Sequence, residues 1–133
     1  MLTICDTHIL LFWADEPSRL SPKANAALNL GLETGTLACS DISLWEIAML
    51  YSRGRINNYA GISSSTYIND ILTAMRITIL PITSEIAEIS QSSVFIHGDP
   101  ADRIIAATTF AHRTKLITAD DKLRHTAGLQ CIW

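Results

Sequence analysis

The segment HGDPADRIIAATTFAHR, residues 97–113, contains two aspartates, Asp99 and Asp102, at the predicted start of a helix. Asp99 precedes Pro100, a residue that favours the first helical position, so Asp99 fits the N-cap. One carboxylate is enough to cap a helix end, and the second therefore needs another explanation. Carboxylate oxygens are also the ligands that Mg²⁺ and Mn²⁺ prefer. The pair is consistent with a helix end and with a metal site.

Three further acids stand where an ordinary structural role explains them less fully. Asp6 ends the first apolar run of the chain, LTIC, and Asp120 directly follows the apolar run LITA. Glu46 is the only charge between Asp41 and Arg53, in a segment that is apolar on all sides. A buried glutamate is costly unless it is paired or bound to a metal ion. These acids are therefore candidates for chemistry.

Each of these acids also has a plain structural interpretation, which is weakest for Asp6, where only a short helix starting at Thr7 could need it. Ser43 and Glu46 have the S-x-x-E spacing of a capping box, in which both side chains bond backbone amides at a helix start. Asp120 or Asp121 fits the cap of a last short helix, and one of the two is then left over. We favour Asp120 for the site because it directly follows LITA.

The elements that must position these acids alternate along the chain. Apolar runs predict five strands at residues 2–6, 36–40, 77–83, 115–119 and 129–133. Periodic segments predict helices at 7–14, 22–33, 41–53, 66–76, 84–95, 100–113 and 121–127. Strands that are apolar throughout and alternate with helices indicate a parallel sheet covered on both faces. We therefore expect an α/β fold with three α/β/α layers around a central, mainly parallel five-stranded sheet, in one domain spanning residues 1–133.

In such folds ligands bind beyond the carboxyl ends of the strands. Asp6, Glu46, Asp102 and Asp120 come from distant parts of the chain and are predicted to meet at that edge. Neither histidine nor cysteine joins them at ligand spacing, and an oxygen-only set suits Mg²⁺ or Mn²⁺. Without a cation the four carboxylates would repel one another.

Composition limits the remaining possibilities. Hydrophobic residues make up 48% of the 133 residues, and the net charge is −3, which gives no basic footprint for nucleic acid. When the four candidate ligands are set aside, however, nine acidic and ten basic residues remain, so the rest of the surface need not repel RNA. No apolar run approaches a membrane span, and the N-terminus lacks a signal peptide, so we expect a cytoplasmic protein. The three cysteines and the tryptophans Trp13, Trp45 and Trp133 are expected in the core, although a tryptophan can also stack on a base.

Two other acid-based families fit the sequence less well. A phosphatase of the haloacid dehalogenase type also has an aspartate after the first strand, but it needs a second aspartate at the position of His8. A two-component receiver domain also gathers acids on a doubly wound sheet, but it leaves Glu46 and Asp102 unexplained.

The ordered motifs of the chain resemble those of PIN-domain ribonucleases. The segments CDTHILLFWADEPSRLSPKA, SDISLWEIAML, LPIT, HGDPADRIIAATTFA, LITADDKL and the closing CIW follow in the family's order. They are most similar to VapC-type toxins with a D-T-H start, an S-x-W-E helix and an H-x-D-P-x-D-R motif. The resemblance covers essentially the whole chain. It implies a PIN-like α/β/α sandwich that cleaves RNA with Mg²⁺ or Mn²⁺, in a family where many members are homodimers held inactive by a small antitoxin protein.

The resemblance also assigns positions in this chain. The catalytic and metal-binding acids it implies are Asp6, Glu46, Asp102 and Asp120. Supporting positions are Thr7 and Thr118, which flank the acids, and Asp99 as a cap or outer ligand. His97, two residues before Asp99, is a candidate for substrate contact or proton transfer. Ala101 departs from the family, where an aromatic residue is frequent, and this affects local packing.

The functional expectation is Mg²⁺-dependent hydrolysis of RNA phosphodiester bonds, in the toxin of a type II toxin–antitoxin pair. The alternative is a catalytically silent PIN-fold module that binds RNA or protein. The apolar outer side of helix 41–52, with neighbouring helices, is predicted to contact an antitoxin or a second subunit because it exceeds what one sheet face can bury. The sequence leaves open the number of metal ions and the RNA that is cleaved.

Overall fold

The computed structural model describes residues 1–56, 61–95 and 98–133. Its centre is a parallel five-stranded sheet in the order β3-β2-β1-β4-β5. The strands are β1 (Thr3–Cys5), β2 (Leu37–Ser40), β3 (Thr78–Leu80), β4 (Leu116–Ile117) and β5 (Cys131–Ile132). The expected α/β fold with a parallel five-stranded sheet is confirmed. The sheet edges are β3 and β5, and β1 lies at the centre.

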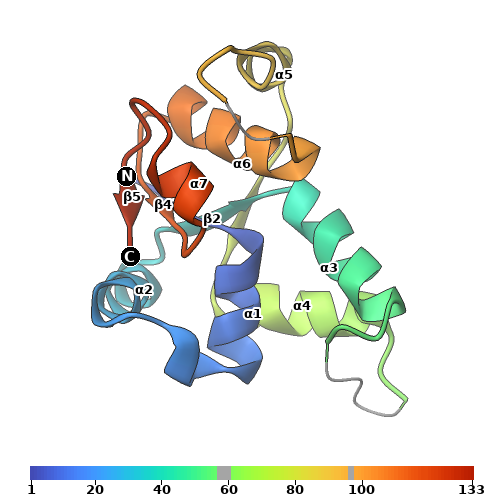
Figure 1. Ribbon diagram of the computed structural model, residues 1–133. Helices are drawn as coiled ribbons and strands as arrows, with labels where there is room; N and C mark the ends of the chain where they lie inside the picture. The colour runs from blue at the N-terminus through green and yellow to red at the C-terminus, as the bar shows by residue number, and fades with distance from the viewer. Residues whose placement is uncertain (57–60, 96–97) are drawn as a thin grey trace.

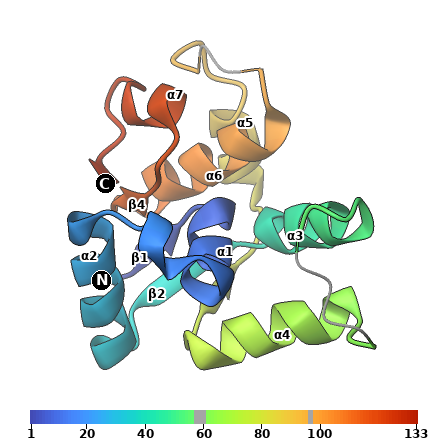
Figure 2. The same cartoon turned by 60° about the horizontal axis from the view of Figure 1, so that its bottom comes forward.

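Helices occupy both faces of this sheet. They are α1 (Thr7–Asp15), the 3₁₀ turn η1 (Pro17–Arg19), α2 (Pro22–Thr34), α3 (Ile42–Ser52), α4 (Ser64–Ala74), α5 (Ser84–Ile89), α6 (Pro100–Ala111) and α7 (Asp121–Arg124). Figure 1 shows α5, α6 and α7 on one side, with α1, α2 and α4 on the other. Figure 2 shows α3 beside the sheet, where it packs against both α4 and α6.

Alternating side chains of the strands divide the core into two clusters. Cys5, Leu37 and Ile117 pack with α1, α2 and α4, whereas the neighbouring Ile4 and Leu116 pack with α6 and α7. Successive side chains of a strand point to opposite faces, so a strand that is apolar throughout supplies both clusters. This explains why the strand sequences show no alternation of polar and apolar residues.

Most predicted elements end earlier in the structure than in the sequence prediction. β1 stops at Cys5 because Asp6 is already the N-cap of α1. Helix α5 spans Ser84–Ile89, much less than the expected 84–95, and its following serine, Ser90, donates its hydroxyl to the Ala87 carbonyl at 2.6 Å. Serines that bond their own backbone in this way compete with helix continuation.

No helix within the described residues is both long enough and apolar enough to span a membrane. Of the cysteines, Cys5 and Cys39 are buried as expected, whereas Cys131 is half-buried.

Helix α2 approaches the sheet closely at Gly31, and this contact gives a stability prediction. A Cβ atom at Gly31 would lie 2.2 Å from Cδ2 of Leu37, a fully buried side chain of β2. Gly31→Ala should therefore lower the free energy of unfolding by about 1–3 kcal/mol, because an overpacked core must shift. Urea unfolding measures this change.

The control for Gly31→Ala is Asn29→Ala, at an exposed position of the same helix. This change should leave stability equal or slightly raised, since alanine is the best helix former. A Gly31→Ala protein that is more stable than the wild type would contradict the close packing of α2 on β2.

Candidate metal centre

Three of the candidate acids are the N-caps of helices. Asp6 precedes α1, Asp99 precedes α6 and Asp120 precedes α7. In each case Oδ1 accepts hydrogen bonds from backbone amides of the first turn: from Thr7 at 2.8 Å for Asp6, and from Lys122 at 2.8 Å for Asp120. The first amides of a helix have no partner within the helix, so each cap is a structural requirement. The caps fix where these three carboxylates lie.

Glu46 comes from inside α3 and does not form the capping box suggested by its spacing from Ser43. The helix begins at Ile42, so Ser43 lies within it and is fully buried. Its hydroxyl lies 2.9 Å from Oγ1 of Thr7, and the same Thr7 hydroxyl donates to Oε1 of Glu46. Glu46 is therefore held by Thr7 at the start of α1.

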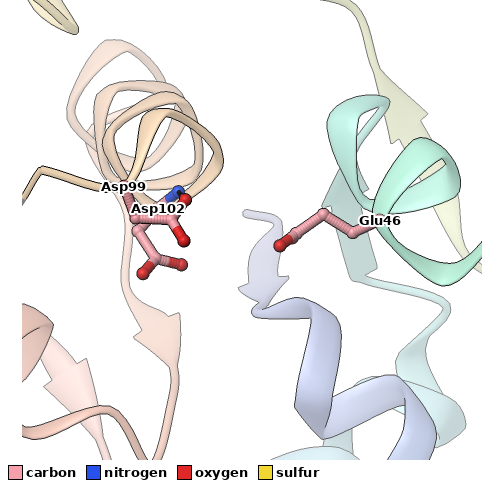
Figure 3. A group of neighbouring side chains, drawn as sticks. All are labelled: Glu46, Asp99 and Asp102. Carbon is pink, nitrogen blue, oxygen red and sulfur yellow. Dashed lines mark hydrogen bonds between the residues drawn. The ribbon is translucent and has the colours of Figure 1, made fainter. Parts of the chain in front are cut away.

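Glu46, Asp99 and Asp102 meet between α3 and α6. Each offers one carboxylate oxygen, and the three oxygens lie within 4.8 Å of one another. Figure 3 shows Glu46 reaching from α3 toward the two aspartates at the start of α6. Glu46 and Asp102 are half-buried, and Asp99 is exposed. The helix cap at Asp99 and the acid Asp102 thus lie in one cluster of carboxylates.

Asp6 lies next to this cluster and is held on several sides. The residue is only 2% exposed, and Oδ2 accepts a hydrogen bond from the Thr118 hydroxyl at 2.7 Å. The same Thr118 hydroxyl accepts the backbone amide of Asp120 at 3.0 Å. Thr118 therefore links the ends of β1 and β4 and relates the positions of Asp6 and Asp120.

His8 also belongs to the site, although the sequence does not indicate it, because a single histidine near a helix start has no ligand spacing to the acids. Its Nε2 accepts the backbone amide of Ala119 at 2.9 Å. Neutral His8 therefore carries its proton on Nδ1, which lies 3.5 Å from Oδ2 of Asp6. The imidazole bridges the buried carboxylate and the loop before Asp120. The one available signal is its position two residues after an N-cap aspartate.

The electrostatics of the acids reflect their mutual proximity. Burial raises the pKa of Asp102, and the charges of Asp6, Asp99, Asp120 and Glu46 add to the effect, so that the pKa reaches about 8. Burial also raises the pKa of Asp6 above its usual value, although His8 and the Thr118 hydrogen bond oppose the shift. Of the four predicted acids, the structure therefore groups Glu46 and Asp102 with Asp99, and it places Asp6 and Asp120 near enough to disfavour the ionisation of Asp102.

Glu46 follows the same trend. Burial raises its pKa, the hydrogen bond from Thr7 lowers it, and the charges of Asp6 and Asp99 raise it again. A set of carboxylates that disfavour their own ionisation matches the needs of a hard cation, which supplies the missing positive charge. The oxygen-only donor set fits Mg²⁺ or Mn²⁺.

The remaining supporting positions have different outcomes. Thr7 and Thr118 both bond candidate acids, as described above. Asp121 is exposed, and its side chain lies 3.4 Å from Arg124, pointing to a role on the surface of α7. His97 lies outside the described residues.

The expectation that Trp45 packs in the core is wrong. Its side chain is 58% exposed, whereas Trp13 and Trp133 are half-buried against the core as expected. The other apolar side of α3 packs inward through Leu44, Ala48, Leu50 and Tyr51. Because α3 lies beside the sheet and not over it, one of its faces has no layer to cover it.

Comparison with known proteins places this geometry in a family. A model of the PIN domain matches residues 3–129. The chain is 34% identical over 122 residues to Ribonuclease VapC22 of Mycobacterium tuberculosis, an alignment covering 91% of this chain and 88% of that protein.

Solved structures show the same fold. A VapBC2 complex from Rickettsia felis, bound to a DNA fragment from its promoter, matches with a TM-score of 0.72 at 18% identity, covering 98% of this chain and 97% of that one. A DNA-bound VapBC complex from Salmonella typhimurium matches with a TM-score of 0.69 at 15% identity and the same coverage. The chain belongs to the PIN-domain family and is related to its VapC-type ribonucleases.

Proposed function

We propose that this chain is a divalent-metal-dependent ribonuclease and the toxin of a type II toxin–antitoxin pair. The observation that carries the proposal is the approach of Glu46, Asp99 and Asp102 to within 4.8 Å, with Asp6 and Asp120 close enough to raise the pKa of Asp102. Helix capping accounts for Asp6, Asp99 and Asp120, but it gives no reason for Glu46 and Asp102 to lie near them. The relationship to Ribonuclease VapC22 supports RNA as the substrate.

In this proposal Asp6, Glu46, Asp102 and Asp120 hold the cation, with Mg²⁺ as the expected ion. When bound, a divalent ion lowers the pKa of a coordinated water, orients the scissile phosphate and offsets charge that develops on oxygen. Thr7 and Ser43 orient the Glu46 carboxylate, and Thr118 orients Asp6. Asp99 remains the N-cap of α6 and supports the carboxylates that hold the cation. One of the half-buried carboxylates, Glu46 or Asp102, accepts the proton of the attacking water.

The acids predict an unusual dependence of stability on pH. The folded protein binds the Asp102 proton more tightly than the unfolded chain does, since the pKa rises from 3.8 to about 8. This contribution stabilises the folded state as pH falls below 8 and is lost above it. In EDTA the melting temperature should therefore decrease as the pH is raised from 6 to 9. Asp102→Asn should make this decrease smaller.

Addition of Mg²⁺ should change this profile, because the cation competes with the proton for the same carboxylates. The rise in melting temperature on adding Mg²⁺ is expected to be larger at pH 8.5 than at pH 6. An equal rise for the wild type and Asp102→Asn at both pH values would mean that the ion does not bind this cluster.

Cleavage of RNA tests the activity directly. Asp6→Asn should lower kcat/KM by more than about 100-fold, because loss of a residue that merely supports a metal ligand already costs 10- to 100-fold. Asparagine also caps helices well, so the variant should still fold. The measurement is cleavage of single-stranded RNA with Mg²⁺, with EDTA and with the variant.

Asp121→Asn is the matched control for Asp120→Asn. The two residues are adjacent, but Asp121 is exposed and pairs with Arg124, so its loss should leave cleavage unchanged while the loss of Asp120 lowers it. RNA binding without cleavage by the wild type would favour the alternative, a silent PIN-fold module. Cleavage by Asp6→Asn at the wild-type rate would falsify the site.

The toxin role predicts protein partners. The compared structures are VapBC complexes, which supports an antitoxin that covers this chain. We expect a homodimer of about twice 14.6 kDa, and a larger complex when the candidate antitoxin is added. Light scattering with size exclusion gives both masses. A monomer whose mass and RNA cleavage do not respond to the antitoxin would count against the toxin role.

A further inference from the structure

A pocket of about 460 Å³ lies between α3 and α6, directly beside the acids. Two of its lining residues, Glu46 and Asp99, belong to the carboxylate cluster. The rest of its wall is apolar: Ile42, Trp45, Met49, Pro100, Ala101 and Ile104. The volume lies within the range of small-molecule sites. An occupant of this pocket therefore lies next to Glu46, one of the residues proposed to hold the cation.

Trp45 gives this pocket an aromatic wall. Its side chain is 58% exposed, and it adjoins Glu46 in the sequence. Both residues line the same pocket, so its wall contains an indole as well as a carboxylate of the cluster (Figure 3 shows where Glu46 extends from α3). A single exposed hydrophobic side chain is normal on a protein surface, but Trp45 borders a concave, mostly apolar space that includes residues of the candidate site.

The chemistry of the pocket selects one part of an RNA chain. Its acidic rim disfavours a second phosphate, which carries the same charge as Glu46 and Asp99. Its apolar wall suits a flat, weakly polar group, and nucleobases stack on aromatic side chains regardless of their sequence. A phosphate held at the acids places its neighbouring nucleoside within a few ångströms of them, which is where the pocket begins.

We infer that the pocket binds the nucleobase next to the scissile phosphate, with Trp45 as its stacking surface. This inference rests on the proposed ribonuclease function. It assigns Trp45 a binding role and adds a substrate subsite on the α3–α6 side of the acids. Because stacking tolerates any base, the subsite contributes affinity and positioning more than sequence selection.

Steady-state cleavage of a short RNA tests the subsite. Trp45→Ala should raise KM by roughly 5- to 150-fold, the loss expected for one stacked base. Trp45→Phe keeps an aromatic face and should stay within a few-fold of the wild type. Leu30→Ala removes an equally exposed apolar side chain from α2 and should change nothing.

An abasic substrate separates stacking from a structural effect. The RNA carries one abasic nucleotide on the 5′ or the 3′ side of the cleaved bond, each tested in turn. For one of these substrates, the KM of the wild type should rise to the value that Trp45→Ala shows on intact RNA. In both cases the contact between the indole and the base is absent. If Trp45→Ala still lowers cleavage of both abasic RNAs as much as that of intact RNA, the indole does not stack on either base and the inference is wrong.

A fluorescence measurement keeps the subsite testable if the wild type fails to cleave RNA. The chain has three tryptophans, so Trp13→Phe with Trp133→Phe leaves Trp45 as the only indole. A short RNA added with Ca²⁺ should quench the fluorescence of Trp45. This result would support the subsite even if the nuclease proposal fails. Absence of quenching would overturn the subsite. An unchanged KM in Trp45→Ala together with an altered solution mass would also overturn it, and would assign this face to a protein partner.

Discussion

Repulsion among carboxylates at one rim of the sheet is the constraint that shapes this molecule. The chain opposes it with backbone amides: three of the acids cap helices, and the N-terminus of a helix carries partial positive charge that favours an anion. Hydroxyl donors from Thr7 and Thr118 add to this. These donors do not remove the penalty, since the pKa of Asp102 still rises to about 8. A bound cation, as proposed above, would offset this penalty.

The layers of the fold could be predicted because burial leaves a direct trace in the sequence. Strands such as β2, which is buried at every position, must have helices on both faces, and the two clusters of the core confirm this. Strand lengths were overestimated because apolar residues continue into turns and caps. The predicted helix at 84–95 is present but shorter for a different reason, since Ser90 bonds the local backbone in place of extending α5.

The candidate site could be located from strand ends and chain order, but not its supporting contacts. The link between Thr7 and Ser43 joins residues 36 positions apart, and that between His8 and Ala119 spans 111 positions. No local pattern encodes such pairs. The burial of Trp45 was misjudged because α3 is apolar on all sides, so the sequence could not indicate which side lacks a neighbouring layer.

The two roles considered for Asp99 and Asp102 are compatible, because a carboxylate has two oxygens and a cap needs only one. Oδ1 of Asp99 accepts the amides of Ala101 and Asp102, which aligns the first turn of α6 and turns Asp102 toward Glu46. The cap therefore builds the site. The same holds at β1 and β4, where Asp6 and Asp120 begin helices and face the cluster. Loss of a helix cap in this chain would also displace a candidate ligand, so stability and the proposed chemistry depend on the same hydrogen bonds.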